Sequence, residues 1–257
     1  MLPVRRLTFV VAAVVALLVP AGAARAQRLS ADQWAESVRS SIDAATRAGG
    51  VRRLVESRGL VARAVAAHPD DALLRHYEGF VLYRLVTVGA GELSPAATAA
   101  FLHDARVALE ASIARRPMAE SWLLLSEVYG RQIAADPSRA ATLGPAMALA
   151  RARAMSAGAT NPRVYLLAGI AAIYADPAAG GGLDAAEQLL QAAVDLFERD
   201  RVTPPAPAWG RAEAFAWLGQ VYQRTDRAPA AAALYARALA LEPDNAWVRD
   251  VLVPSVR

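Results

Sequence analysis

The stretch from Arg211 to Asn245 constrains the fold more than any other part of this sequence. Its first half carries apolar or small residues at three- and four-residue spacing, which places them on one face of a helix. These residues are Phe215, Leu218, Gly219 and Tyr222. After a break at residues 224–228, a second stripe follows, formed by Ala231, Tyr235 and Ala238. Pro243 ends the second helix because proline lacks the N–H that a helix interior needs. The stretch therefore predicts a pair of helices joined by a short turn.

The small residues of this stretch have a physical purpose. Gly219 and Ala231 let the two helices approach closely, and the aromatic side chains fill the volume beside that contact. One such hairpin cannot bury its own apolar face, so the hairpin needs similar neighbours along the chain. We therefore expect a row of hairpins.

The rest of the chain supplies these neighbours. Ser30 and Gln33 form a capping-box pattern that opens a helix to about residue 48. Helix starts and stops further along the chain predict helices over 51–67, 72–86, 95–115, 146–157 and 183–198, with others beginning near 119 and 161, and a capping helix over 246–253. Alternation of apolar and polar residues is missing, so strands are not expected. The prediction is an all-α solenoid of about five hairpins plus a C-terminal capping helix.

Residues 119–245 resemble the tetratricopeptide repeat (TPR) superfamily. Trp122, Leu125 and Tyr129 match the aromatic, Leu and Tyr positions of the last repeat, whereas the first two hairpins lack the Leu-Gly pair. The resemblance implies a right-handed superhelix whose concave groove binds a peptide, a protein or sometimes a small ligand.

A narrower similarity lies in residues 161–182. The run from Asn161 to Gly169, followed by Pro177 and three glycines at 180–182, is similar to exported bacterial TPR proteins of undefined role. More distantly, it is similar to the TPR component of TRAP-type solute transporters. That component is usually a lipoprotein, and this chain has no cysteine to carry a lipid.

The first 26 residues read as a signal peptide. Arg5 and Arg6 precede an apolar run at 7–19, and Ala24-Arg25-Ala26 forms an A-x-A cleavage site. Thirteen residues of helix span about 20 Å, which is less than the roughly 30 Å of a bilayer core. We therefore expect a solenoid domain over 27–257, exported to the periplasm and not stably inserted in the membrane after cleavage. The alternative is that the segment is retained as an anchor.

The charge balance gives no reason to expect nucleic acid as a partner. The sequence carries 28 basic and 24 acidic residues. Three of the arginines belong to the predicted signal peptide, and without them the net charge is close to zero. Cysteine is absent, which excludes disulfides and thiolate chemistry.

The first helix of each hairpin should line the concave groove. Arg84, Arg131 and Arg224 fall at the same inner position of three repeats, and Tyr174 takes that position in the fourth. A guanidinium matches a carboxylate in shape, so this stripe suits an acidic or C-terminal peptide. The alternative is that arginine is abundant here and often ends helices. The full set of predicted groove residues is His76, Tyr83, Arg84, Glu127, Arg131, Tyr174, Gln220, Gln223 and Arg224.

The sequence gives little support for catalysis or for metal binding. The three histidines form no metal motif, and no G-x-S-x-G elbow is present, so neither an enzyme nor a metal or other cofactor is expected. The leading hypothesis is a periplasmic scaffold or adaptor that binds a protein or peptide in its groove. The alternative is a carrier of a small organic acid that acts with a solute transporter, which would require an enclosed, mainly apolar cavity.

Overall fold

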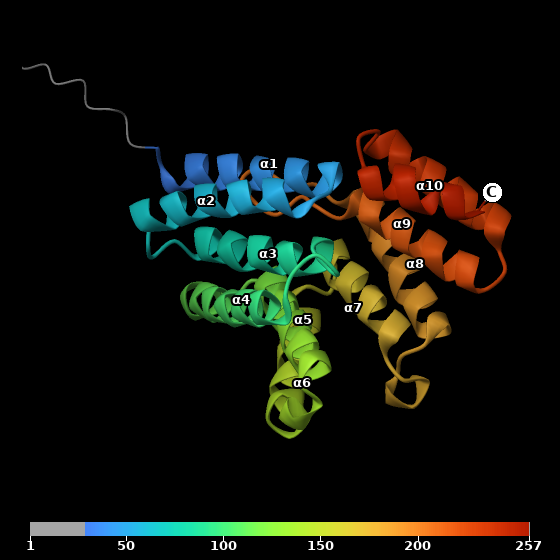
Figure 1. The fold of residues 1–257 in the computed structure, drawn as a ribbon, viewed down its shortest axis with the longest axis horizontal. Helices are drawn as coiled ribbons and strands as arrows, with labels where there is room; N and C mark the ends of the chain where they lie inside the picture. The colour runs from blue at the N-terminus through green and yellow to red at the C-terminus, as the bar shows by residue number, and fades with distance from the viewer. Residues whose placement is uncertain (1–28, 257) are drawn as a thin grey trace, which may run out of the picture.

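The computed structural model describes residues 29–256, which fold into five helical hairpins stacked in a curved row (Figure 1). The hairpins are α1 (Ala31–Ala48) with α2 (Val51–Ala67), α3 (Ala72–Val88) with α4 (Pro95–Arg115), α5 (Ala119–Ala135) with α6 (Ala140–Ala157), α7 (Pro162–Tyr174) with α8 (Leu183–Arg199), and α9 (Arg211–Arg224) with α10 (Ala228–Leu241). No strand occurs within this part of the chain, and the all-α superhelical solenoid is confirmed. The predicted signal peptide lies outside the described residues.

Several helix starts follow from side-chain caps. Ser30 Oγ accepts from the Gln33 N–H at 3.2 Å, and Gln33 Oε1 accepts from the Ser30 N–H at 2.9 Å. This reciprocal pair is the predicted capping box. Asp71 and Ser94 cap α3 and α4 with one bond each, their side chains accepting from a backbone N–H three residues later. Local sequence therefore fixes where these helices begin.

Two predicted boundaries are wrong. Helix α6 begins at Ala140 rather than 146 and contains Pro145, preceded by a short 3₁₀ turn, η1 (Pro137–Arg139). A proline this close to the start of a helix removes only a hydrogen bond of the first turns, so the helix continues through it. The expected capping helix at 246–253 is instead a π-type turn, η3 (Val248–Leu252), followed by a 3₁₀ turn, η4 (Pro254–Val256).

In three hairpins the two helices make their closest approach at a glycine of the first helix. A Cβ added at Gly79 of α3 would lie 2.5 Å from Leu109 Cγ of α4, and one at Gly169 of α7 would lie 2.7 Å from Leu190 Cγ of α8. A Cβ at Gly219 of α9 would overlap the Tyr235 ring of α10. Three of the five hairpins thus use the same device, and the second helix places a large side chain where the first has none.

The stack curves until its two ends touch. Helix α6 makes almost no contact with α7, so α7 packs on α5 instead and the row bends there. Figure 1 shows the end of α1 beside the last hairpin. Arg47, at the end of α1, forms an ion pair of 3.2 Å with Asp244, which follows α10. Ala246 lies within 3.6 Å of the position of a Cβ on Gly49. The first and last hairpins are therefore neighbours in space.

We predict that Gly79→Val lowers the free energy of unfolding by about 1–3 kcal/mol, because the added carbons overlap Leu109 in a filled core. Urea unfolding followed by circular dichroism measures this change. The matched control is Gly59→Ala in α2, where an added Cβ meets only the end of Arg63 at 3.9 Å. This control should be neutral or stabilising because alanine favours a helix over glycine. Equal stability of Gly79→Val and the unmodified chain would contradict this account of the hairpin.

Candidate functional site

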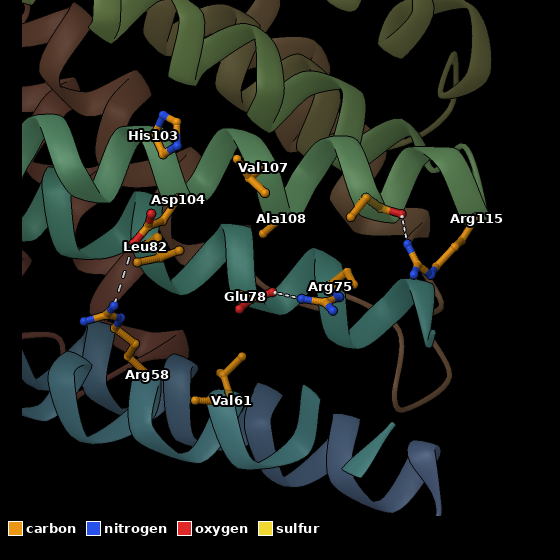
Figure 2. A pocket seen from close by; sticks show the side chains of 12 residues that line it. Arg58, Val61, Arg75, Glu78, Leu82, His103, Asp104, Val107, Ala108 and Arg115 are labelled. Carbon is orange, nitrogen blue, oxygen red and sulfur yellow. Dashed lines mark hydrogen bonds and ion pairs between the residues drawn. The ribbon is translucent and has the colours of Figure 1, made fainter. Parts of the chain in front are cut away.

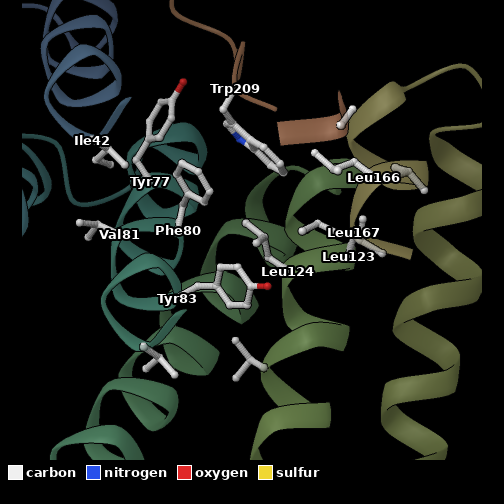
Figure 3. Packing of buried hydrophobic residues seen from close by; sticks show 14 of the residues in the cluster. Ile42, Tyr77, Phe80, Val81, Tyr83, Leu123, Leu124, Leu166, Leu167 and Trp209 are labelled. Carbon is white, nitrogen blue, oxygen red and sulfur yellow. The ribbon is translucent and has the colours of Figure 1, made fainter. Parts of the chain in front are cut away.

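The inner face of the superhelix is lined by the first helix of each hairpin, and one half of it is filled by the chain itself. The segment at 200–210, between α8 and α9, passes across this face. Tyr77 of α3 donates a hydrogen bond of 2.6 Å from its hydroxyl to the Pro205 carbonyl. Trp209 is buried and stacks on Phe80, with 5.0 Å between ring centroids. Figure 3 shows the Trp209 ring between Phe80 of α3 and Leu166 of α7.

Arg84 belongs to this closed half. Its two terminal nitrogens donate to both carboxylate oxygens of Glu213 in α9, each at 2.6 Å. Its guanidinium lies 4.9 Å from the Phe80 ring centroid and 5.4 Å from that of Trp209. Burial alone would lower the pKa of Arg84, but the Glu213 carboxylate offsets this and raises it above the ordinary value. The prediction that Arg84 lines an open groove is wrong, because the residue is only 8% exposed and already holds a carboxylate.

His76 is also enclosed, contrary to prediction. Its side chain has no exposed surface, and Nδ1 lies 2.9 Å from Ser121 Oγ, which in turn contacts Ser112 Oγ at 3.0 Å. Burial lowers the pKa of His76 to about 4, so the ring is neutral near pH 7. The His76–Ser121 contact has the residue types of a nucleophile and its base, but a substrate has no access to a fully buried pair.

Two arginine–tyrosine stacks mark the other half of the inner face. Arg131 of α5 lies 5.4 Å from the ring centroid of Tyr83 in α3, and Arg224 of α9 lies 5.5 Å from that of Tyr174 in α7. Tyr83 is buried beneath its arginine, so it does not line the surface as predicted. Tyr174 is 67% exposed. Neither Arg131 nor Arg224 forms an ion pair with an acidic residue within 29–256, whereas Arg84 does.

The remaining predicted residues divide between this half and the C-terminal end. Glu127 lies one helical turn before Arg131 and is partly buried. Gln220 accepts a long contact of 3.5 Å from Arg224. Gln223 instead donates to the Ser255 carbonyl at 3.0 Å and accepts from the Tyr235 hydroxyl at 3.0 Å. Gln223 therefore holds the end of the chain against the last hairpin, and its predicted role in the groove stays a prediction.

We call the predicted groove residues that are neither enclosed in the core nor bound to the end of the chain the arginine face. It comprises Glu127, Arg131, Tyr174, Gln220 and Arg224. These residues come from α5, α7 and α9. The sequence placed all five of them on the inner side of their helices, because the repeat register fixes which side of each first helix points inward.

A hollow that the sequence did not predict lies on the surface formed by α2, α3 and α4, with α3 between the other two helices (Figure 2). It is open to solvent and measures about 430 Å³. Its charged side chains are largely paired: Arg75 contacts Glu78 at 2.9 Å, and Arg58 lies 3.8 Å from Asp104. Its lining residues come from three helices and form no local motif, so no sequence signal was available to find it.

Residues 29–256 lack two further features. No helix in this range is both long and apolar enough to cross a membrane. No three residues of the metal-ligating types gather there in a group that could hold an ion.

Comparison with known proteins identifies the fold. No protein-family model and no curated protein sequence matches the chain. Among solved structures, the HusA haemophore from Porphyromonas gingivalis superposes with a TM-score of 0.62 and 22% identity, over 75% of this chain and 94% of that one. The thermophilic TPR protein TTC0263 from Thermus thermophilus superposes with a TM-score of 0.57 and 21% identity, over 88% and 98% of the two chains.

A third match is the Cut9–Hcn1 hetero-tetramer of the APC/C. Its TM-score is 0.52 at 16% identity, over 80% of this chain and 33% of that one. At these identities the similarity defines the fold alone, which is that of the TPR solenoids.

We predict that Glu213→Ala lowers the free energy of unfolding by about 3 kcal/mol, because it leaves the Arg84 guanidinium buried without its counter-ion. Chemical denaturation measures the loss. The control is Asp250→Ala, which removes the partner of Arg249 in an exposed pair of 2.8 Å and should change stability little. Comparable effects of the two substitutions would show that the Arg84–Glu213 pair does not hold the inner face closed.

Proposed function

We propose that this TPR-fold chain is a binding scaffold whose arginine face holds an acidic segment or the C-terminus of a protein or peptide. The observation that carries the proposal is which of its inner arginines are paired with an acidic residue and which are not. Arg131 and Arg224 are each held against a tyrosine ring and lack an acidic partner within the described residues, whereas the equivalent Arg84 is satisfied by Glu213. A guanidinium fixed by stacking loses little freedom when it binds a carboxylate through two parallel hydrogen bonds.

The geometry favours an extended ligand. Helices α5, α7 and α9 lie side by side on the inner face, and neighbouring helix axes are roughly 8–10 Å apart. A ligand that contacts both Arg131 and Arg224 must therefore span about 20 Å, which requires six or more residues of extended chain. A peptide meets this requirement and a small organic acid does not.

A small-molecule carrier, the alternative, has less support. A carrier needs an enclosed cavity, and the centre between α3, α5 and α7 is filled by Trp209, Phe80 and Leu124 (Figure 3). The similarity to a haemophore concerns the fold and does not transfer the ligand. A role for the chain beside a solute transporter has no counterpart among the structural matches and stays a prediction.

We further propose that the protein is exported and works in the periplasm as a binder without catalysis. The support for export is the sequence of residues 1–26. The support for a role without catalysis is the inaccessible position of His76 and Ser121, the one contact between a histidine and a hydroxyl that the described residues make.

Binding of synthetic octapeptides with acidic, neutral and basic C-terminal halves tests the proposal. We expect the acidic set to bind best and Arg131→Glu/Arg224→Glu to weaken that binding at least tenfold. Each arginine contributes a charge-assisted hydrogen bond of about 1.5–3 kcal/mol. Calorimetric titration measures the dissociation constants.

The matched control is Arg52→Glu/Arg153→Glu. These arginines are exposed on α2 and α6 and form no ion pair within 29–256, so the total charge changes equally while the inner face is untouched. Equal affinity for acidic and basic peptides, or equal loss of affinity in the two double variants, would rule out the arginine face as the site.

A further inference from the structure

The hollow formed by α2, α3 and α4 is a cavity that the proposed function does not use (Figure 2). Its volume of about 430 Å³ lies within the range of small-ligand pockets, and it is open to solvent. Glu78 and Leu82 of α3 line it. They lie about 160° around that helix from His76 and Phe80, which face the inner side of the row. The hollow is therefore separate from the arginine face.

The middle of the hollow is apolar. Its apolar lining residues come from all three helices and are Val61, Ala62, Leu82, Val107, Ala108 and Ala111. Leu82 and Val61 are buried in the core, whereas Val107 is 49% exposed. An aliphatic body in the hollow would remove the Val107 side chain from water while it packs on a floor that the core holds in place. Burial of each ligand methylene group raises affinity up to about fourfold.

One end of the hollow is basic, and Figure 2 shows Arg75 of α3 and Arg115 of α4 there. Arg115 donates from Nη2 to Asp70 at 2.7 Å, but the Asp70 side chain is 88% exposed, so this ion pair is weak and replaceable. Arg75 donates from Nη1 to Glu78 at 2.9 Å and from Nε to a backbone carbonyl. Its Nη2 makes no hydrogen bond within residues 29–256. Both guanidinium groups can therefore receive a further carboxylate.

The opposite end is crossed by an ion pair. Arg58 of α2 lies 3.8 Å from Asp104 of α4, beside Leu82 (Figure 2). Between Leu82 and Arg75 the helix axis of α3 advances about 10 Å, so the apolar floor is short. A helix is about 10 Å wide and would break the crossing pair, whereas a narrow chain fits beneath it. The shape of the hollow thus favours a small, slender ligand over a partner helix.

The charges of the lining favour an anion. Three arginines line the hollow, at 58, 75 and 115, against two acids, Glu78 and Asp104. With His103 counted as neutral, the lining carries one net positive charge. A ligand with a single negative charge at the basic end is the electrostatic complement of this lining.

We propose that the hollow is a second binding site, which takes a monocarboxylate with an unbranched aliphatic body of about eight carbons. An extended carbon chain advances roughly 1.25 Å per bond, so eight carbons span the roughly 10 Å between Leu82 and Arg75. The ligand carboxylate accepts hydrogen bonds from Arg115 and from Arg75 Nη2, and Asp70 turns into water. The aliphatic body packs on Leu82 and Val107. This is an open surface site, not the enclosed cavity of a carrier, and it does not rest on the proposed function.

The test uses octanoate as the probe, with hexanoate, octan-1-ol and octylammonium as comparison ligands. Calorimetric titration measures the dissociation constants. We expect octanoate to bind at one site with a dissociation constant below about 1 mM. Hexanoate should bind roughly tenfold more weakly, because it lacks two methylene groups. Octan-1-ol should bind at least fivefold more weakly because it lacks the charge, and octylammonium should not bind.

Two variants separate the basic end from the apolar floor. Arg115→Gln should weaken octanoate binding at least fivefold and leave octan-1-ol binding unchanged, whereas Val107→Gln should weaken both. The matched controls lie on α2 outside the hollow and should bind octanoate normally. Arg63→Gln removes an exposed arginine that has no ion pair within 29–256, and Val55→Gln changes a valine that is also 49% exposed.

Several results would overturn the proposal. These are equal binding of octanoate and octylammonium, full affinity in Arg115→Gln or Val107→Gln, and no saturable binding of octanoate at about 10 mM. Loss of octanoate binding in Arg131→Glu/Arg224→Glu would place the ligand on the arginine face and also overturn it. Normal octanoate binding by that double variant supports a separate site, whether or not acidic peptides bind. Circular dichroism of each variant ensures that a loss of affinity is not a loss of fold.

Discussion

The close approach of paired helices at glycine is the constraint on which the rest of this structure depends. Gly79, Gly169 and Gly219 each admit a large side chain of the second helix, so the two axes lie close together and the hairpin becomes a flat unit with two apolar sides. Such a unit is stable only between neighbours. Five of them in a row leave two unpartnered ends, and here the ends meet through Arg47 and Asp244.

Closure divides the inner face into two halves with different electrostatic character. In the closed half, Trp209 is buried against Phe80, and the Arg84 charge is stabilised there by a two-bond pair with Glu213 beside the two aromatic rings. In the other half, Arg131 and Arg224 keep contact with solvent and are steadied by tyrosine rings instead of by acids. An arginine that solvent can reach does not need an internal counter-ion, and this leaves its donors available to a partner.

The sequence could predict what depends on neighbours along the chain. Ser30, Asp71 and Ser94 cap their helices through bonds that span three residues, so helix starts were readable in advance. The repeat register likewise predicted which side of each first helix faces inward. The sequence could not predict that Arg84 forms an ion pair within the chain while Arg131 does not. The carboxylate that binds Arg84 is 129 residues away in sequence and reaches it only when the row of hairpins closes. His76 was misplaced for the same reason, since its partner Ser121 belongs to the next hairpin.

Helix α3 is the element at which the two halves join. Arg84 turns toward Glu213 in the closed half, while Tyr83, its neighbour in sequence, supports Arg131 in the open half. Tyr83 is buried in the same core cluster as Phe80 and Trp209. The guanidinium of Arg131 therefore packs against a ring whose position is fixed by the core of the closed half. Rigid support lowers the entropy that a binding group must lose when it engages a ligand. The chain segment that fills half of the inner face therefore contributes to the binding capacity of the half that remains open.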